Sequence, residues 1–289
     1  MDSLELLYDM GLNVKPYRKI YRVIKYNSEN TKREIVEKKP IYYLFLRGSG
    51  NSIQPSIESQ LKNQAKKLGI EFRFSETIRD PDIIATGTRK ANIFSYGGIF
   101  ENVNMEEAVY VLYDFKYAPK GYIYILPYYD NKALIANVCF DKTKTDQVKD
   151  LFYKLLKENN VIKSIIRNAE LIETRYGTGG YHNNFYEGMD KDHYLIGEAA
   201  GFIDPARGFG LRYAFLSGFL VAKAIVKNLN FKELWQKSFG TELKDGFKRR
   251  KVFNKLNNKK LNELISNMDK KSSLGEYTEK RSKFENKAF

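Results

Sequence analysis

The chain has 289 residues, of which 43% are hydrophobic and 14% aromatic, a composition typical of a folded protein with a large core. It carries 49 Lys and Arg against 35 Asp and Glu, and this net charge of +14 favours anionic partners such as phosphate groups or phospholipid head groups. A lysine-rich solvated surface with no particular partner is the alternative. Cys139 is the only cysteine and His182 and His193 the only histidines, so neither a disulfide framework nor a metal site is expected.

The first third of the chain predicts a mixture of helices and strands with βαβ character, judged from hydrophobic spacing and glycine stops. The expected elements are a helix over 3–10 ended by Gly11, a hairpin over 17–39 turning at 27–30, a strand over 40–50, a helix over 53–68 between a Ser52 cap and Gly69, and strands over 70–74 and 82–87.

From residue 91 the pattern changes to short aromatic strands, which predict an antiparallel sheet. A helix over 145–159, a strand near 169–177 and a loop over 177–184 follow. The loop reads "GTGGYHNN", and because no helical pattern comes after it, we interpret it as a connection between domains rather than a dinucleotide loop. A buried strand over 193–196 then leads to a long helix that begins near Leu211.

Residues 242–289 contain 14 Lys and Arg and 7 Asp and Glu, so half of the net charge lies there. Within them, 247–265 predicts a basic amphipathic helix, which either packs on the body of the protein or contacts a membrane surface. Nucleic acid is not an expected partner, because no recognition motif accompanies the charge. Arg212 and Lys223 interrupt the most apolar stretch, and no signal peptide is recognised, so a cytoplasmic protein, peripheral at a membrane through this region, is expected.

Residues 197–218, "GEAAGFIDPARGFGLRYAFLSG", carry the strongest functional signal. Gly197 permits a tight exit from a strand, and Gly208 and Gly210 directly precede the long helix. Backbone N–H groups at such a glycine-lined helix start stabilise negative charge. A strand, turn and helix with glycines only for packing is the structural alternative, but four glycines and three alanines within 197–210 favour a ligand.

This segment, extended to "LIGEAAGFIDPARGFGLRYAFLSG", resembles the corresponding segment of the geranylgeranyl reductase family, which consists of FAD-dependent enzymes of the p-hydroxybenzoate hydroxylase-like flavoprotein superfamily. "PKGYIYILP" at 119–127 is similar to the family's P-x-x-Y-x-W-x-F-P motif, and 47–74 is a looser match. Without the first segment, "GYIYILP" would be interpreted as a strand with period 2. The resemblance covers residues 1 to about 230.

The resemblance implies an α/β (α+β) fold in which a Rossmann-like FAD-binding domain is interleaved with an antiparallel-sheet substrate domain. The implied division is 1–90 for the remainder of the FAD-binding domain with an inserted hairpin, 91–188 for the substrate domain, 189–230 for the flavin-facing strand and helix, and 231–289 for a basic helical region. The family's first strand and Gly-rich turn are not found before Ser3, so the FAD-binding domain is expected to be incomplete at its N-terminus through a late start, a gene fragment or a genuine short form.

The resemblance also implies the residues of the site. The residues implied to bind FAD are Arg47, Gly197, Glu198, Ala199, Ala200, Gly201, Gly208, Phe209 and Gly210. The residues implied to line the substrate cavity are Pro119, Tyr122, Tyr124 and Pro127. Glu198 stands where the family usually has Asp, and Tyr124 where it has Trp. Tyr122 and Tyr124 are candidates for supplying or positioning a proton, although an ordinary phenol is a weak acid at neutral pH.

The implied function is reduction of isoprenoid double bonds of the geranylgeranyl type in membrane lipid biosynthesis, with FAD as cofactor and NAD(P)H or a ferredoxin as reductant. Two alternatives stay open. One is a related flavin monooxygenase or halogenase, and the other is a flavin-free homologue that binds a lipid or a membrane. "PKGYIYILP" favours the reductase over the first alternative, whereas the absence of the Gly-rich turn favours the second.

Overall fold

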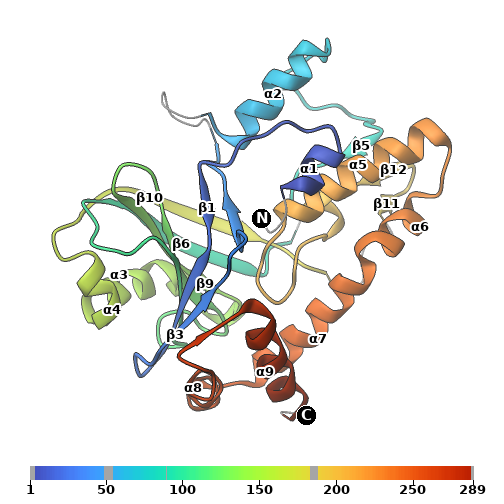
Figure 1. Cartoon of the computed structure of the whole chain (residues 1–289). Coiled ribbons are helices and arrows are strands. Elements are labelled where there is room, and N and C mark those ends of the chain that lie inside the picture. The colour runs from blue at the N-terminus through green and yellow to red at the C-terminus, as the bar shows by residue number, and fades with distance from the viewer. Residues whose placement is uncertain (1–3, 49–54, 89, 183–187, 288–289) are drawn as a thin grey trace.

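The computed structural model describes residues 4–48, 55–88, 90–182 and 188–287. A large sheet of eight strands forms the middle of the molecule, with helices against it and beside it (Figure 1). Its strands, in spatial order, are β10 (Glu170–Gly179), β6 (Ile93–Glu101), β9 (Lys132–Cys139), β8 (Tyr122–Pro127), β7 (Val109–Tyr113), β2 (Arg22–Asn27), β3 (Lys32–Val36) and β13 (Lys271–Ser272).

This sheet extends beyond the predicted range of 91–188. The hairpin of β2 and β3 forms as expected, but β2 pairs in parallel with β7, and β13 from the C-terminal region pairs in parallel with β3. Neighbouring residues Val23 and Ile24 of β2 are both buried, one on each face. A strand that is apolar on both faces needs cover on both sides, which an isolated inserted hairpin would not provide.

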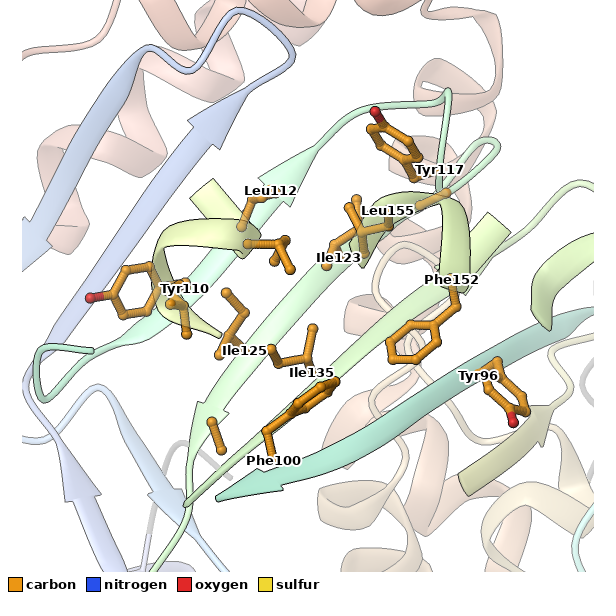
Figure 2. Close-up of a cluster of buried hydrophobic side chains, with 14 of the residues drawn as sticks. Tyr96, Phe100, Tyr110, Leu112, Tyr117, Ile123, Ile125, Ile135, Phe152 and Leu155 are labelled. Atoms are coloured by element: carbon orange, nitrogen blue, oxygen red, sulfur yellow. The ribbon is translucent and has the colours of Figure 1, made fainter. Parts of the chain in front are cut away.

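One face of the large sheet is covered by α3 (Val148–Glu158) and α4 (Asn160–Ile165), as Figure 2 shows. Ile123, Ile125 and Ile135 point from the strands toward Phe152 and Leu155 of α3, and all five side chains are fully buried. These contacts form the largest buried cluster among the described residues, and they hold the alternate residues of β8 on the opposite face.

The opposite face is covered at the β2–β3 end by α8 (Asn258–Ser266) and α9 (Leu274–Lys287). Ile265 and Met268 lie with Val23 and Ile35 in one buried cluster. The prediction of a single helix over 247–265 is wrong, because Leu256 is extended between α7 (Thr241–Lys255) and α8, and the Asn257 side chain accepts the Lys260 N–H to cap α8.

The remaining strands form two small sheets. β1 (Arg18–Ile20) pairs with β4 (Tyr42–Leu44), and β12 (His193–Leu195) lies between β11 (Met189–Asp190) and β5 (Ile83–Ile84), pairing with β5 in parallel. The expected strand over 70–74 does not form, and the segment is irregular and exposed. The rings of Phe72 and Phe74 stack on each other instead, 6.2 Å between centroids.

The helices beside the small sheets are α1 (Glu5–Asp9), α2 (Ile57–Lys67), α5 (Leu211–Lys227), α6 (Phe231–Trp235), the π-helix η3 (Gln236–Gly240) and the 3-10 helix η2 (Gly197–Ala200) (Figure 1). The 3-10 helix η1 (Lys142–Gln147) instead follows β9 and contacts α3. The α2 cap is Ser56, which accepts the Ser59 N–H at 3.1 Å, whereas the expected cap Ser52 lies outside the described residues. Within the described ranges, no helix is long and apolar enough to cross a bilayer.

Candidate functional site

The segment after β12 forms a tight turn that is fastened to α5. Gly197 and Gly201, at either end of η2, have left-handed φ values of 56° and 77° that favour glycine. The Gly197 N–H donates to the Ser217 hydroxyl at 2.8 Å, and that hydroxyl is fully buried and donates to the Tyr213 carbonyl at 2.7 Å. Ser217 was not among the expected site residues, and it ties η2 to the long helix.

The two alanines of the turn face inward. Ala199 and Ala200 are buried, and Ala200 belongs to the same cluster as Tyr213 and Leu216 of α5. Their small side chains let the turn pack closely against the helix. Any ligand contact from these residues must therefore come from their backbone groups.

Glu198 reaches back to the loop after β10. Its carboxylate accepts the Gly180 N–H at 2.7 Å. Burial raises the pKa of the Glu198 carboxyl above its ordinary 4.5, and the Gly180 hydrogen bond opposes that rise. A Cβ at Gly180 would lie 2.1 Å from the Thr88 hydroxyl, so only glycine fits there. The loop that the sequence suggested was a domain connection thus also anchors the turn.

A second compact turn, Asp204–Phe209, precedes α5. The Asp204 N–H donates to the Phe209 carbonyl at 2.9 Å, the Gly208 N–H donates to the Asp204 carbonyl at 2.7 Å, and Gly208 has φ 77°. Gly210 provides no side-chain cap for α5. The first N–H groups of a 17-residue helix therefore point past an exposed turn, with the positive end of the helix dipole behind them.

The aromatic residues of β8 face this turn. Tyr122, Tyr124 and Leu126 alternate with buried residues of the other face, and both tyrosines pack against a cluster that includes Ile203. The Tyr122 hydroxyl donates to the Arg207 carbonyl. Burial raises the pKa of Tyr122 well above its ordinary value and also raises that of Tyr124, so both phenols stay protonated at neutral pH.

The two prolines of the motif have other environments. Pro127 is buried, in phase with Ile123 and Ile125 rather than with the two tyrosines, and its carbonyl accepts the Tyr17 hydroxyl at 3.0 Å. Pro119 is half-buried, and its carbonyl accepts the Phe140 N–H at 3.1 Å. The tyrosines, and not Pro127, are therefore the motif residues on the face of β8 that contacts Ile203.

Arg47 and Phe209 lie at the surface. The Arg47 side chain pairs with Glu58 of α2, and within the part of the chain that the structure describes it has no contact with either turn. Phe209 is 50% exposed and packs edge-on against Tyr42, with 6.4 Å between ring centroids. Of the residues implied to meet a flavin, the structure brings together those of the two turns and leaves Arg47 apart.

No family model matches the chain. Among curated proteins, it is 28% identical over 205 residues to the Uncharacterized protein MJ1520 of Methanocaldococcus jannaschii, covering 65% of this chain and 50% of that protein. It is 22% identical over 185 residues to Digeranylgeranylglycerophospholipid reductase 2 of Methanopyrus kandleri, covering 58% and 46%. The chain spans about half the length of the curated relatives that it matches.

Among solved structures, a geranylgeranyl bacteriochlorophyll reductase-like protein (Ta0516) from Thermoplasma acidophilum superimposes with a TM-score of 0.71 at 13% identity, covering 100% of this chain and 86% of that chain. The myxobacterial chondrochloren halogenase CndH, an FAD-dependent halogenase, superimposes with a TM-score of 0.56 at 15% identity, covering 98% and 84%.

These likenesses define the class of fold, which is the mixed α/β fold of FAD-dependent oxidoreductases and halogenases. Within it, the chain is a distant homologue of the digeranylgeranylglycerophospholipid reductases. The resemblance drawn from "GEAAG" and "PKGYIYILP" is thereby confirmed. Ser217 and Gly180 lie in segments that the sequence analysis quotes, but they were missed because their hydrogen bonds join positions 20 and 18 residues apart, which no local pattern reveals.

Proposed function

We propose that the chain is an FAD-dependent reductase of isoprenoid double bonds in a membrane lipid of the geranylgeranyl type. The observation that carries the proposal is the hydrogen bond from the Tyr122 hydroxyl to the Arg207 carbonyl. It joins the aromatic strand to the glycine turn, and these are the two segments that resemble the reductases. The names of the curated relatives support the lipid substrate.

The residues of the turns fit the cofactor in two respects. The N-terminus of α5, which no side chain caps, offers N–H donors and a positive dipole to a negatively charged ring edge. Phe209 offers an exposed ring, next to the half-buried Gly208, against which a planar ring can lie. The proposed FAD contacts are therefore the backbones of η2, Gly208, Phe209 and Gly210.

Bound FAD would supply the hydride for the reduction, with NAD(P)H or a ferredoxin as the source of electrons. The protein's own contribution is orientation and exclusion of water. Tyr124 presents an apolar ring beside the turn, and Tyr122 holds the turn in place through Arg207. Because the raised pKa of both phenols makes them poor acids, we assign them to positioning the substrate and the turn rather than to rapid proton transfer.

Membrane contact through the basic C-terminal region is part of this proposal, but the structure changes which residues are able to make that contact. Val252, Leu256 and Leu261 are buried against the body of the protein. Any contact with anionic head groups would therefore be made by exposed lysines such as Lys251 and Lys259, not by an apolar helix face.

The test uses the purified chain with added FAD, a chemical reductant and no oxygen. Bound flavin is measured by its visible absorbance after gel filtration, and reduction of a digeranylgeranylglycerophospholipid by mass spectrometry. Tyr122→Phe removes one hydrogen bond of the turn and should lower the rate about tenfold. Tyr176→Phe, an exposed tyrosine of β10, is the matched control and should react like wild type.

If the chain bound no FAD, the flavoenzyme proposal would be wrong. If it bound FAD but consumed oxygen with a halide or an aromatic substrate, and left the lipid unchanged, the monooxygenase or halogenase alternative would replace the reductase. Equal rates for Tyr122→Phe and Tyr176→Phe would remove the role assigned to the Arg207 contact.

A further inference from the structure

A basic pocket lies between the large sheet and α7, outside the two turns. Its volume is about 370 Å³. Residues before β6, after β9 and after β10 form one side, and one face of α7 forms the other. The lining residues are Lys90, Asn92, Lys142, Tyr181, His182, Phe247, Arg250, Lys251 and Asn254. None of these pocket residues was among the expected site residues.

The lysines and the arginine that line the pocket give it positive charge. Lys90, Lys142, Arg250 and Lys251 line it, and no carboxylate does. Among the described residues, no Asp or Glu oxygen lies within ion-pair distance of these three lysines, although such pairs occur elsewhere, as between Lys248 and Asp245 of the same helix at 3.1 Å. Four cations around one cavity repel one another, and an anion in the pocket relieves that repulsion.

Arg250 is the buried member of the group, with 2% of its surface exposed. Its Nη2 donates to the Lys120 carbonyl at 2.7 Å, and its guanidinium lies 4.2 Å from the Phe140 ring centroid and 4.7 Å from that of Phe253. Nε and Nη1 are buried and have no hydrogen-bond partner among the described residues. The charge of this guanidinium is therefore only partly offset by hydrogen bonds, and an anion in the adjoining pocket would stabilise it.

His182 lies in the same pocket, and the positive charge of the pocket affects its pKa. Its pKa is lowered from 6.5 by burial and by the nearby Lys90 and Lys142. Tyr181, Arg250 and Lys251 are the other titratable or charged groups that face the pocket. Because the chain has only two histidines, His182 can be followed without ambiguity against His193.

We propose that this pocket binds a phosphate group, with Arg250 at its buried end and Lys90, Lys142 and Lys251 around it. The oxygens of a phosphate group can accept hydrogen bonds from several donors of different geometry at the same time. A phospholipid head group and a soluble phosphate compound share this chemistry, and the experiments below distinguish them.

The position of the pocket favours the lipid. Arg250 stacks on Phe140, and Phe140 belongs to the cluster against which Tyr122, Tyr124 and Tyr181 pack. A lipid phosphate in the pocket would therefore leave its chains beside the aromatic face of β8. This lipid assignment rests on the proposed function, whereas the phosphate site stands without it.

The first experiment titrates the histidines by NMR with and without inorganic phosphate. A bound dianion stabilises the imidazolium, so the pKa of His182 should rise by about one unit, which corresponds to about tenfold tighter phosphate binding by the protonated form. The His193 signals should not respond. The paired substitution Lys142→Gln with Lys251→Gln should abolish the response and lower phosphate affinity at least about tenfold.

The matched control is Lys144→Gln with Lys248→Gln, which removes the same charge from the same two elements without touching the pocket. This control should bind phosphate like wild type. If both pairs of substitutions weakened phosphate binding equally, the effect would come from net charge alone and the proposed site would be wrong. An unchanged His182 pKa in the presence of phosphate would also overturn it.

The second experiment compares phosphatidylcholine vesicles with and without phosphatidylglycerol in a flotation assay. Phosphatidylglycerol-dependent binding that is lost in the Lys142 and Lys251 pair but kept in the control pair assigns the pocket to a lipid head group. Phosphate binding without such vesicle binding assigns it to a soluble phosphate compound. FAD binding is measured on the same samples, so the failure of the pocket and the failure of the flavoenzyme proposal are distinguishable.

Discussion

At the scale of single residues, the site depends on hydrogen bonds that hold two turns in place. Glu198 is the clearest example. Its carboxylate accepts the Gly180 N–H at 2.7 Å. The Glu198 side chain therefore joins the turn to the loop that follows β10, and its role depends on a contact between two segments rather than on the turn alone.

Ser217 gives a prediction at this scale. Ser217→Ala removes the acceptor of the Gly197 N–H and leaves that group buried without a partner. The free energy of unfolding should fall by about 1–3 kcal/mol, measured by urea denaturation. Ser164→Ala removes a hydroxyl that donates to the Val161 carbonyl at an exposed site, and it should change stability little. Equal losses in the two variants would contradict the role of Ser217.

At the scale of elements, the β2–β3 hairpin is joined to the sheet by an ion-pair cluster. Arg22 contacts Glu34 at 2.9 Å and Glu106 at 2.5 Å, and Lys32 contacts Glu34 at 2.9 Å. Arg22 and Lys32 lower the pKa of Glu34 from 4.5 to about 2. The contacts of Arg22 and Lys32 with Glu106 cross from the hairpin to the segment before β7, so they stabilise the pairing of β2 with β7.

The lowered pKa of Glu34 predicts a pH dependence. A carboxyl with a folded pKa below its unfolded value stabilises the fold above about pH 4.5, and that stabilisation is lost as pH falls toward about 2. Glu34→Gln should therefore be less stable than wild type near neutral pH by about 1 kcal/mol, and the difference should vanish in acid. Glu29→Gln, in the turn of the same hairpin, is the control, and a constant difference at every pH for Glu34→Gln would contradict the prediction.

At the scale of the whole molecule, α7 connects the glycine turns to the C-terminal region. Gly246 of α7 lies against Pro205, and a Cβ there would approach the Pro205 side chain to 2.7 Å and Asp204 Oδ1 to 3.0 Å. Arg250, one turn further along the same helix, reaches Lys120 before β8. One helix thus contacts the turn that precedes α5 and the start of the aromatic strand, which keeps the two parts of the site in register.

Two glycine substitutions test that arrangement. Gly218→Ala in α5 meets only Ile196 at 3.9 Å and should stabilise the protein by about 0.5–1 kcal/mol through helix propensity. Gly246→Ala gains the same propensity but forces α7 away from Pro205, so its melting temperature and its FAD binding should both fall below those of Gly218→Ala. A Gly246→Ala variant as stable as Gly218→Ala would show that α7 does not need this close approach.

The elements with strong local signals were predictable from the sequence. The aromatic strands β6 to β9, the helix α5 and the stop at Gly69 follow from alternation, helical spacing and a left-handed glycine. Gly208 and Tyr122 were predicted as site residues because each belongs to a segment with a recognisable pattern. Local signals failed at 70–74, where apolar alternation predicts a strand but no neighbouring strand pairs with it in the described structure.

By itself, the sequence determined the glycine-lined turn before the long helix and the alternating aromatic strand, since both depend on backbone conformation and local periodicity. Only the tertiary structure decided that β2, β3 and β13 extend the sheet, that Glu198 reaches Gly180, and that four cations from separate elements line one pocket. These features depend on contacts between distant segments, and hydrophobic spacing along one segment carries no information about which other segment it will meet.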